Sequence, residues 1–229
     1  TIGFSPPANT GGLPITGYTV SCNGGTVTAS GASAPIVVSG LTNGTLYTCS
    51  VQASNLAGSS PASATVTVTP VAIAFTGIVQ SRKLHGVAGL FVVPINPATP
   101  IGGAIAIEPR SIGSGHQVAF TFNNPPTSLT ALTVLDAGGQ PVGSASPSFA
   151  GNDLVITLTG VPDGKRVTIT ATGVNGAINV SASVGFLLGD VNGSGTVTAT
   201  DIAAIKSRST QSTTLTNFRA DLNTSGAIS

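Results

Sequence analysis

The chain has 229 residues and a net charge of +1, and only 7% of its residues are charged, whereas an ordinary globular domain carries about 25%. No basic cluster occurs, so the charge pattern excludes nucleic acid and an anionic membrane surface as its ligands. Residues 1–81 contain no Asp, Glu, Lys, Arg or His, which excludes acid–base catalysis from that part of the chain.

The length predicts two domains, or two domains and a small module. Changes in composition near Pro70 and Gly189 predict three parts, residues 1–70, 71–188 and 189–229. No stretch approaches 18 uninterrupted apolar residues, so we expect no membrane span. The chain starts without Met or a basic leader, and we interpret it as an internal part of a longer protein.

Short runs rich in Val, Ile and Thr, separated by Gly, Pro and Asn, recur up to about residue 188 and predict antiparallel β-strands. Several alternate apolar and polar residues with period 2, which is typical of sheets with one solvated face. The expected strands cover residues 15–22, 34–41, 47–53, 64–68, 71–75, 118–122, 132–135, 154–158 and 167–171. The predicted fold class is therefore mainly β, with two successive β-sandwiches and a small helical module at the end.

Three segments of the first part carry a recognisable pattern: residues 14–20, the Leu-x-x-Gly-x-x-Tyr run at 41–47, and 51–58 with its Val-x-Ala-x-Asn sequence. On these residues the part resembles a fibronectin type III domain, in the bacterial form often appended to secreted enzymes and surface proteins. The resemblance implies a β-sandwich over residues 1–70 that lacks its first strand, strand A. Because this part has no ionisable side chain other than Tyr and Cys, we expect it to act as a spacer or in weak binding. Tyr47 starts a strand after a glycine turn, where its hydroxyl can bond back to that turn.

Both cysteines of the chain, Cys22 and Cys49, lie in this part. The resemblance makes their strands neighbours in one sheet. Cys22 shares parity with Tyr18, and Cys49 shares parity with Tyr47, so both sulfur atoms would face one side. We therefore expect a Cys22–Cys49 disulfide and an oxidising, exported location. The alternative is a pair of small buried thiols.

Residues 71–188 predict a β-sandwich of about eight or nine strands, of unknown role. Polar side chains cluster at residues 81–86 and 108–110, and His116 follows. One interpretation is a two-His-one-carboxylate metal site or a polar ligand patch, formed by His85, Glu108 and His116. The other is a set of loop salt bridges with the histidines at strand ends, formed by Arg82, Lys83, Glu108 and Arg110.

Carbohydrate-binding surfaces use exposed aromatic side chains, and residues 71–188 contain no Trp or Tyr. Most of their aromatic residues lie in strand-like runs, where we expect them in the core: Phe75, Phe91, Phe120, Phe122, Phe149 and Phe186. A carbohydrate-binding or adhesive sandwich is therefore only an alternative.

Residues 190–201 follow the pattern of an EF-hand calcium loop, in which every second side chain points at the ion and Gly195 stands at position 6, where the loop turns sharply. The candidate ligands are Asp190, Asn192, Ser194 and Asp201 at positions 1, 3, 5 and 12, the carbonyl oxygen of Thr196 at position 7, and Thr198 at position 9 through water or its hydroxyl. With only two carboxylates, the loop is expected to bind Ca²⁺ weakly, with a Kd of about 10⁻⁴–10⁻³ M. The alternative is a metal-free loop of Asx turns.

A second copy of the loop begins 31 residues after Asp190 and supplies Asp221, Asn223 and Ser225 at positions 1, 3 and 5. It ends at Ser229, position 9, so its position-12 acid is absent from this chain. Between the copies, Asp201 opens a short helical pattern in which Ile202 and Ile205 share a face.

Duplicated loops of this kind make residues 189–229 similar to a type I dockerin that is truncated in its second repeat. In that family the module needs calcium to fold and binds cohesin modules. Loop positions 10 and 11 and the following helix carry the cohesin contact. The corresponding residues here are Ala199, Thr200, Lys206, Ser207 and Arg208.

These observations predict a non-catalytic spacer and calcium-dependent docking region of a secreted or cell-surface bacterial protein, with a cohesin-like partner. An alternative parent is a secreted polysaccharide-degrading enzyme whose catalytic domain lies outside this chain. No nucleophile elbow, phosphate loop or His-Glu-x-x-His sequence occurs in these residues, so we expect no catalysis by them.

Overall fold

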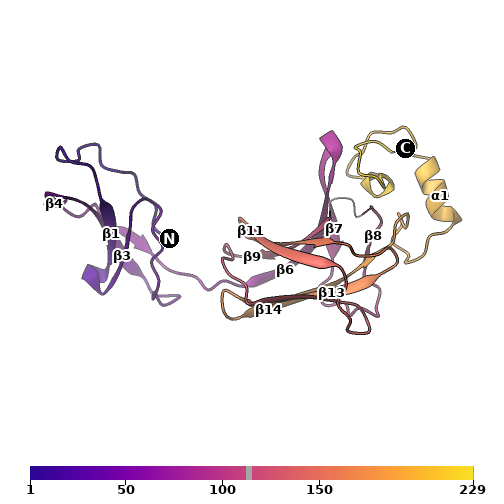
Figure 1. Cartoon of the computed structure of the whole chain (residues 1–229), viewed down its shortest axis with the longest axis horizontal. Coiled ribbons are helices and arrows are strands. Elements are labelled where there is room, and N and C mark those ends of the chain that lie inside the picture. The colour runs from indigo at the N-terminus through magenta and orange to yellow at the C-terminus, as the bar shows by residue number, and fades with distance from the viewer. Residues whose placement is uncertain (112–114, 229) are drawn as a thin grey trace. The chain divides into compact units, whose positions relative to one another are not determined.

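The computed structural model describes residues 1–111 and 115–228. The chain divides into two compact units, Thr1–Ala72 and Ile73–Ser229. Strands dominate both units, and one α-helix, α1 (Ala199–Lys206), is described near the C-terminal end (Figure 1). The predicted mainly β class with a small helical segment at its end is therefore confirmed. Within the described residues, no helix has the length and apolar character that a membrane crossing requires.

In the first unit, one antiparallel sheet has the strand order β2–β1–β3–β4, and β5 also pairs with β3. Alternate side chains of β1 point inward, and Tyr18 and Val20 are buried there, as a period-2 pattern requires. The Thr42 N–H donates to the hydroxyl oxygen of Tyr47 at 3.0 Å, so the expected bond to the turn is present. The elements are β1 (Gly17–Cys22), the 3₁₀ turn η1 (Asn23–Gly25), β2 (Val27–Gly31), β3 (Tyr47–Asn55), β4 (Gly58–Ser59) and β5 (Val66–Val68).

The predicted strand over residues 34–41 is wrong. Among the described residues, the pairing of this segment is limited to an isolated bridge between Ile36 and Ile2. Its side chains alternate as in a strand, since Ile36 and Val38 are buried and Val37 is 69% exposed. Pro35, however, has no N–H to donate to a ladder. The segment therefore closes the core of this unit as extended chain without a partner strand.

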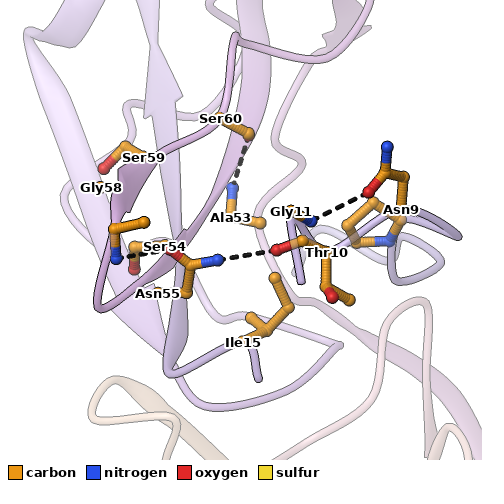
Figure 2. A pocket seen from close by; sticks show the side chains of 12 residues that line it. Asn9, Thr10, Gly11, Ile15, Ala53, Ser54, Asn55, Gly58, Ser59 and Ser60 are labelled. Carbon is orange, nitrogen blue, oxygen red and sulfur yellow. Dashed lines mark hydrogen bonds between the residues drawn. The ribbon is translucent and has the colours of Figure 1, made fainter. Parts of the chain in front are cut away.

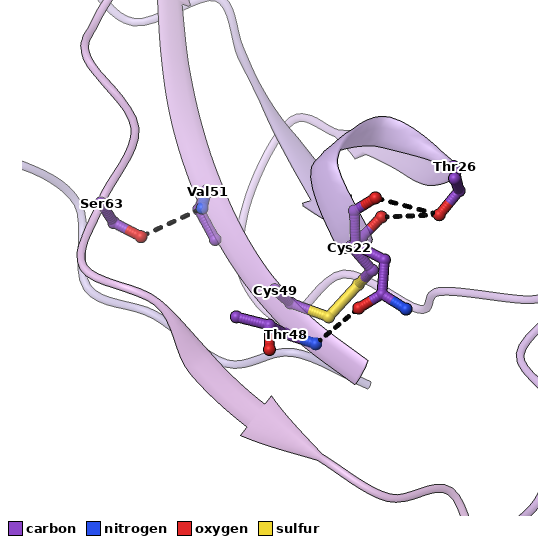
Figure 3. The surroundings of a disulfide bond; sticks show 7 residues. Cys22, Thr26, Thr48, Cys49, Val51 and Ser63 are labelled. Atoms are coloured by element: carbon purple, nitrogen blue, oxygen red, sulfur yellow. Dashed lines mark hydrogen bonds between the residues drawn. A yellow bond between two sulfur atoms is a disulfide. The ribbon is translucent and has the colours of Figure 1, made fainter. Parts of the chain in front are cut away.

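Cys22 and Cys49 form the expected disulfide bond, so the alternative of two free thiols is wrong. The two residues lie opposite each other in β1 and β3, with their Cα atoms 4.0 Å apart, and both are fully buried. Figure 3 shows the bond between the two strands, and beside it the Val51 N–H donates to the Ser63 hydroxyl oxygen at 3.0 Å. The bond therefore ties the central strand pair together inside the core.

Replacing both cysteines by alanine is expected to lower the free energy of unfolding of this unit by about 3 kcal/mol. The bond joins residues 27 positions apart, and a cross-link of that span restricts the unfolded chain. Urea denaturation followed by tyrosine fluorescence measures the change, because Tyr18 and Tyr47 are the two tyrosines of the chain. A reductant should weaken the natural chain but not the variant. A variant as stable as the natural chain would contradict the prediction.

The second unit contains two sheets, with the orders β11–β12–β9–β6–β7 and β10–β13–β14–β8. Neighbouring strands are antiparallel except for β14 and β8, which run parallel. The nine strands among the described residues agree with the expected eight or nine. They are β6 (Phe75–His85), β7 (Gly89–Ile95), β8 (Ala106–Glu108), β9 (His116–Phe122), β10 (Ala131–Leu135), β11 (Ser144–Ala150), β12 (Asp153–Thr159), β13 (Arg166–Val174) and β14 (Ile178–Phe186), with 3₁₀ turns η2 (Gly86–Ala88) and η3 (Phe218–Ala220).

Both sheets contribute to one apolar core, as in a β-sandwich. Phe120 and Leu154 come from the first sheet, Val167 and Ile169 come from the second, and all four are fully buried. Burial of each such side chain contributes about 1.5–3 kcal/mol. Aliphatic residues and phenylalanines therefore form the core of this unit, in a chain that has no Trp and no Met.

The predicted strand over residues 71–75 is wrong, because β6 begins only at Phe75. Just before it, the Ala74 N–H donates to the side-chain oxygen of Asn123 at 2.7 Å, and the Asn123 N–H donates to the Ala74 oxygen at 3.0 Å. An asparagine side chain thus replaces a ladder partner. The register of β6 on β9 also shifts between Phe75 and Val79.

The phenylalanines of the sandwich are mostly internal, as expected. Phe91, Phe120, Phe122 and Phe186 are buried. Phe75 is half-buried and lies against two of these rings, while Phe149 is 42% exposed. One exposed ring does not make a flat aromatic surface for a sugar.

Candidate calcium site

The first candidate loop follows β14 and starts at Asp190, which is fully buried. Its Oδ1 accepts the Ser194 N–H at 2.9 Å, and its Oδ2 accepts the Gly195 N–H at 2.6 Å. Gly195 has a φ of +87°, in the left-handed region where glycine is favoured. The loop therefore turns back over its own first carboxylate at position 6, as the motif requires.

The next ligand positions lie around the same carboxylate. The side-chain oxygen of Asn192 also accepts the Ser194 N–H, at 2.8 Å. The Ser194 hydroxyl lies 3.5 Å from Asp190 Oδ1 and donates to the carbonyl oxygen of Thr196 at 3.0 Å. Oxygen atoms from positions 1, 3, 5 and 7 of the loop are therefore close together.

Asp201 closes the loop at the start of α1 and is fully buried. Its Oδ2 accepts the N–H and the hydroxyl of Thr198, at 3.0 and 2.9 Å, and its Oδ1 accepts the Asn192 N–H at 3.2 Å. Burial opposes ionisation of this carboxyl, but the backbone hydrogen bonds outweigh it and lower the pKa of Asp201 below its ordinary value. The same carboxylate thus caps the helix and holds the loop ends together. Thr198, the candidate ligand at position 9, therefore bonds to the Asp201 carboxylate.

The second loop repeats these bonds. Asp221 Oδ1 accepts the Ser225 N–H at 3.1 Å and its Oδ2 accepts the Gly226 N–H at 2.9 Å. The Asn223 oxygen accepts the same Ser225 N–H at 3.2 Å, and the Ser225 hydroxyl donates to the Ala227 oxygen at 2.9 Å. Ser229, its position 9, lies outside the described residues.

The donor set of the first loop fits a calcium ion. All its candidate groups are oxygen atoms, which a hard cation prefers, and they are held in place by backbone amides. Asp190, Asn192, Ser194, the Thr196 carbonyl and Asp201 would hold the ion, and the ion would neutralise the two carboxylates. The described part of the chain contains no group of three or more His, Cys, Asp or Glu side chains able to share a metal, because each loop relies mainly on neutral oxygens.

The polar cluster of the sandwich is buried rather than exposed. Glu108 forms an ion pair with Arg110, and its Oε2 accepts the Ser81 hydroxyl at 2.5 Å. Arg110 also donates to His85 Nε2 at 3.0 Å. The Nδ1–H of His85 then donates to Asp221 Oδ2 at 2.6 Å. A continuous chain of hydrogen bonds therefore links the sandwich to the second loop.

The charge states of the groups in this hydrogen-bond network follow from their burial and from the neighbouring groups. Burial lowers the pKa of His85, whose ring is therefore neutral at pH 7, with its proton on Nδ1. Burial also opposes ionisation of Glu108 and Asp221, but hydrogen bonds from Arg110 and His85, respectively, lower the pKa of each carboxyl. The resulting order is carboxylate, guanidinium, neutral imidazole, carboxylate, in which every donor faces an acceptor.

The salt-bridge interpretation of the cluster is confirmed for two pairs. Glu108 pairs with Arg110, and Arg82 pairs with Asp153 at 2.7 Å. The basic residues lie in or beside strands rather than in loops. Lys83 is buried on β6 and donates to the Gly115 oxygen at 2.6 Å. The partnership of His85 with Asp221, 136 residues away, was not predicted.

His116 is buried, and its Nδ1 has no hydrogen-bond partner among the described residues. Burial lowers the pKa of this ring from 6.5 to about 4, although Glu108 opposes the shift. Between these values the unfolded chain binds a proton that the folded chain does not. Stability from this group is therefore present above pH 6.5 and is lost as the pH falls toward 4.

Acidification from pH 7 to 4 is therefore expected to cost the second unit roughly 3 kcal/mol through His116. Urea denaturation at half-unit pH steps, followed by far-UV circular dichroism, measures the loss. His116→Gln should show a smaller slope over this range, whatever its stability at pH 7. Equal slopes in both proteins would refute the assignment.

The first unit has a hollow of about 330 Å³, lined by polar and small residues (Figure 2). The Asn55 side-chain N–H donates to the Thr10 oxygen at 2.7 Å, and the Gly11 N–H donates to the Asn9 side chain at 2.9 Å. These polar groups bond to one another, and residues 1–72 contain no acid, base or histidine side chain. The hollow therefore offers no catalytic group.

The chain is thus mainly β and ends in two loops with the same hydrogen-bond pattern. Residues 1–69 match the family model of the fibronectin type III domain, and residues 188–229 match that of the dockerin type I domain. Both resemblances drawn from the sequence are therefore confirmed. No curated protein matches the chain. Both domain types occur in extracellular proteins and are non-catalytic, and dockerin type I domains bind calcium and cohesins.

Proposed function

We propose that residues 189–229 form a calcium-binding module that docks this chain onto a cohesin-like protein outside the cell, with residues 1–70 as a spacer. The observation that supports this most is the repetition of one hydrogen-bond pattern around Asp190 and Asp221. A loop that serves only as a turn does not need a buried carboxylate at its first position, and here both loops have one. The match to the dockerin type I family supports the same proposal.

Calcium titration of the full chain by calorimetry tests the metal site. We expect heat of binding at millimolar Ca²⁺, and at least a tenfold weaker affinity in the Asp190→Asn variant, because a carboxylate at position 1 is lost. Asp136→Asn is the matched control. Asp136 also accepts backbone N–H groups, those of Gly138 and Gln140, but in an ordinary turn.

The outcomes separate the two interpretations of the loop. Asp136→Asn should bind calcium as the natural chain does. If the natural chain gives no heat at millimolar Ca²⁺, the loop is a metal-free set of Asx turns and the proposal fails.

The partner surface that we propose is the exposed side of α1. Ala199, Ile202 and Lys206 recur at helical spacing and are exposed, and Thr200 beside them is exposed too. The opposite side of the helix carries buried Asp201. Arg208 is only half-exposed and donates to the Ala204 oxygen, so we assign it a supporting role.

Ile202→Asp is expected to weaken calcium-dependent binding to a cohesin at least tenfold, because it places a charge in the centre of the contact. Binding to a panel of immobilised cohesin modules, with calcium and with chelator, measures this. Leu215→Asp is the control, since Leu215 is also an exposed apolar residue, at 81% against 50% for Ile202, but lies outside the helix. Equal binding by both variants would exclude this face.

Export of the parent protein is supported by the disulfide, because such bonds persist in oxidising surroundings. The parent of this region is proposed to be a secreted or cell-surface bacterial protein, and a secreted polysaccharide-degrading enzyme is one such parent.

A further inference from the structure

The buried polar cluster on β6 and β8 faces the second loop and not the first. Asp190 of the first loop is bonded by Ser194 and Gly195 of its own loop. Asp221, at the same position of the second loop, accepts in addition from Thr213 at 2.8 Å and from His85 of the sandwich at 2.6 Å. The two loops are therefore alike internally and differ in what holds them from outside.

The bond from His85 lies among polar side chains that are almost completely buried. His85, Glu108 and Arg110 are 0–2% exposed, and Asp221 is 1% exposed. His85 accepts from Arg110 through Nε2 and donates to Asp221 through Nδ1. An imidazole is suited to this position because its two nitrogen atoms can accept on one side and donate on the other. Each buried carboxylate of this network therefore accepts hydrogen bonds, and Glu108 also has the Arg110 guanidinium as its counter-charge.

Apolar and backbone contacts surround this chain of bonds. The ring of Phe218, just before the second loop, stacks on Phe91 of β7 with centroids 5.4 Å apart, and Arg110 lies 5.4 Å from the Phe218 centroid. The Ser111 N–H donates to the Leu222 oxygen at 2.8 Å. At Gly86 there is no room for a side chain, because a Cβ atom there would collide with the backbone of Ser225.

Arg219 adds a second connection. Its guanidinium donates to the Ile107 oxygen of β8 at 3.0 Å and to the Val191 oxygen of the first loop at 2.9 Å. The corresponding position before the first loop is Leu188, which is 43% exposed. Phe218 and Arg219, just before the second loop, therefore contact the sandwich through their side chains. Just before the first loop the contact is through the backbone, where the Gly189 N–H donates to the Pro109 oxygen at 3.1 Å.

We infer that residues 81–86 and 108–111 form a docking seat for the second loop of the C-terminal module, with His85 as the positioning residue for Asp221. The seat makes residues 73–229 one cooperative folding unit, with or without calcium. This assigns a role to the sandwich that goes beyond the proposed function. It also explains why a chain with few charges keeps several of them buried here.

Hydrogen exchange with mass spectrometry on the full chain, in excess chelator, tests the seat. Asp221→Asn puts an amide N–H against the donors of His85 and Gly226. We expect at least a tenfold loss of protection in peptides that cover β6 and β7. Asp190→Asn makes the same change in the first loop, and its effect on these peptides should stay within about twofold.

Equal effects of the two variants on β6 and β7, or no effect of Asp221→Asn, would overturn the seat. If Asp221→Asn does not fold, Phe218→Leu replaces it, since that variant removes the ring contacts of Phe218 with Phe91, Arg110 and His85 but none of the polar groups of the network. Phe218→Leu should raise exchange in β7 and in the C-terminal module together, and the control Leu215→Ala should not. A Phe218→Leu protein with unchanged exchange in β7 would also overturn the seat. Because chelator is present throughout, this result does not depend on whether the loops bind calcium.

Discussion

Replacing Arg110 by methionine is expected to lower the free energy of unfolding of residues 73–229 by about 3–5 kcal/mol. The substitution leaves the fully buried Glu108 carboxylate without its counter-charge and His85 Nε2 without its donor. Burying an uncompensated charge costs more than the original pair contributes, because the remaining carboxylate has lost water as well as its partner.

Urea denaturation followed by far-UV circular dichroism measures this loss. Tyrosine fluorescence serves as an internal reference, because both tyrosines lie in the first unit. Arg82→Met is the matched control. Its pair with Asp153 is partly solvated, with side-chain exposures of 19% and 18%, so the expected cost is about 1 kcal/mol or less.

A double variant makes the test sharper. Replacing Glu108 and Arg110 together by methionine should cost less than Arg110→Met alone, because no buried charge is then left unpaired. The prediction fails if Arg110→Met costs no more than Arg82→Met.

Gly86→Ala is expected to destabilise the second unit by about 2–4 kcal/mol and to loosen the C-terminal module. The φ of Gly86 is +46°, which costs an L-residue about 1–2 kcal/mol. The added Cβ would also collide with the carbonyl oxygen of Ser225, which is backbone and cannot rotate away. Such overpacking adds about 1–3 kcal/mol.

Gly77→Ala separates the two causes. Gly77 lies on β6, the strand that ends just before Gly86, and has a φ of +82°, but a Cβ there meets nothing within 4 Å. It should therefore show the backbone cost alone, and exchange in residues 189–229 should stay unchanged. In Gly86→Ala, exchange in that segment should rise at least tenfold. Similar exchange in both variants would mean that Ser225 yields at little cost.

The local motifs were the most predictable features of this chain. The Gly195 turn and the carboxylates at both ends of the first loop lie within twelve residues, so one stretch of sequence contains the whole pattern. The Cys22–Cys49 bond could be predicted because the fibronectin pattern specifies which strands are neighbours. The alternation of side chains along each strand then specifies the face of the sheet on which each sulfur atom lies. The calcium ligands themselves remain a prediction.

The limits of strands were less predictable where a side chain supplied the hydrogen bonds of a partner strand, or where an extended segment had no partner strand. Residues 34–38 alternate like a strand, yet among the described residues only Ile36 forms a bridge, because pairing depends on a partner that the local pattern does not contain. The start of β6 was missed for a related reason, since Asn123 supplies its hydrogen bonds to Ala74 from far along the chain.

By itself, the sequence determined the domain types at both ends, the loop chemistry and the scarcity of charge. Only the tertiary structure decided what the charges of the sandwich do. The sequence does not reveal whether a histidine, a glutamate or an arginine contacts solvent, a metal or another side chain. Their role depends on burial and on one contact between His85 and Asp221, which are 136 residues apart. Such a contact forms only when separate segments pack together, and no local spacing encodes it.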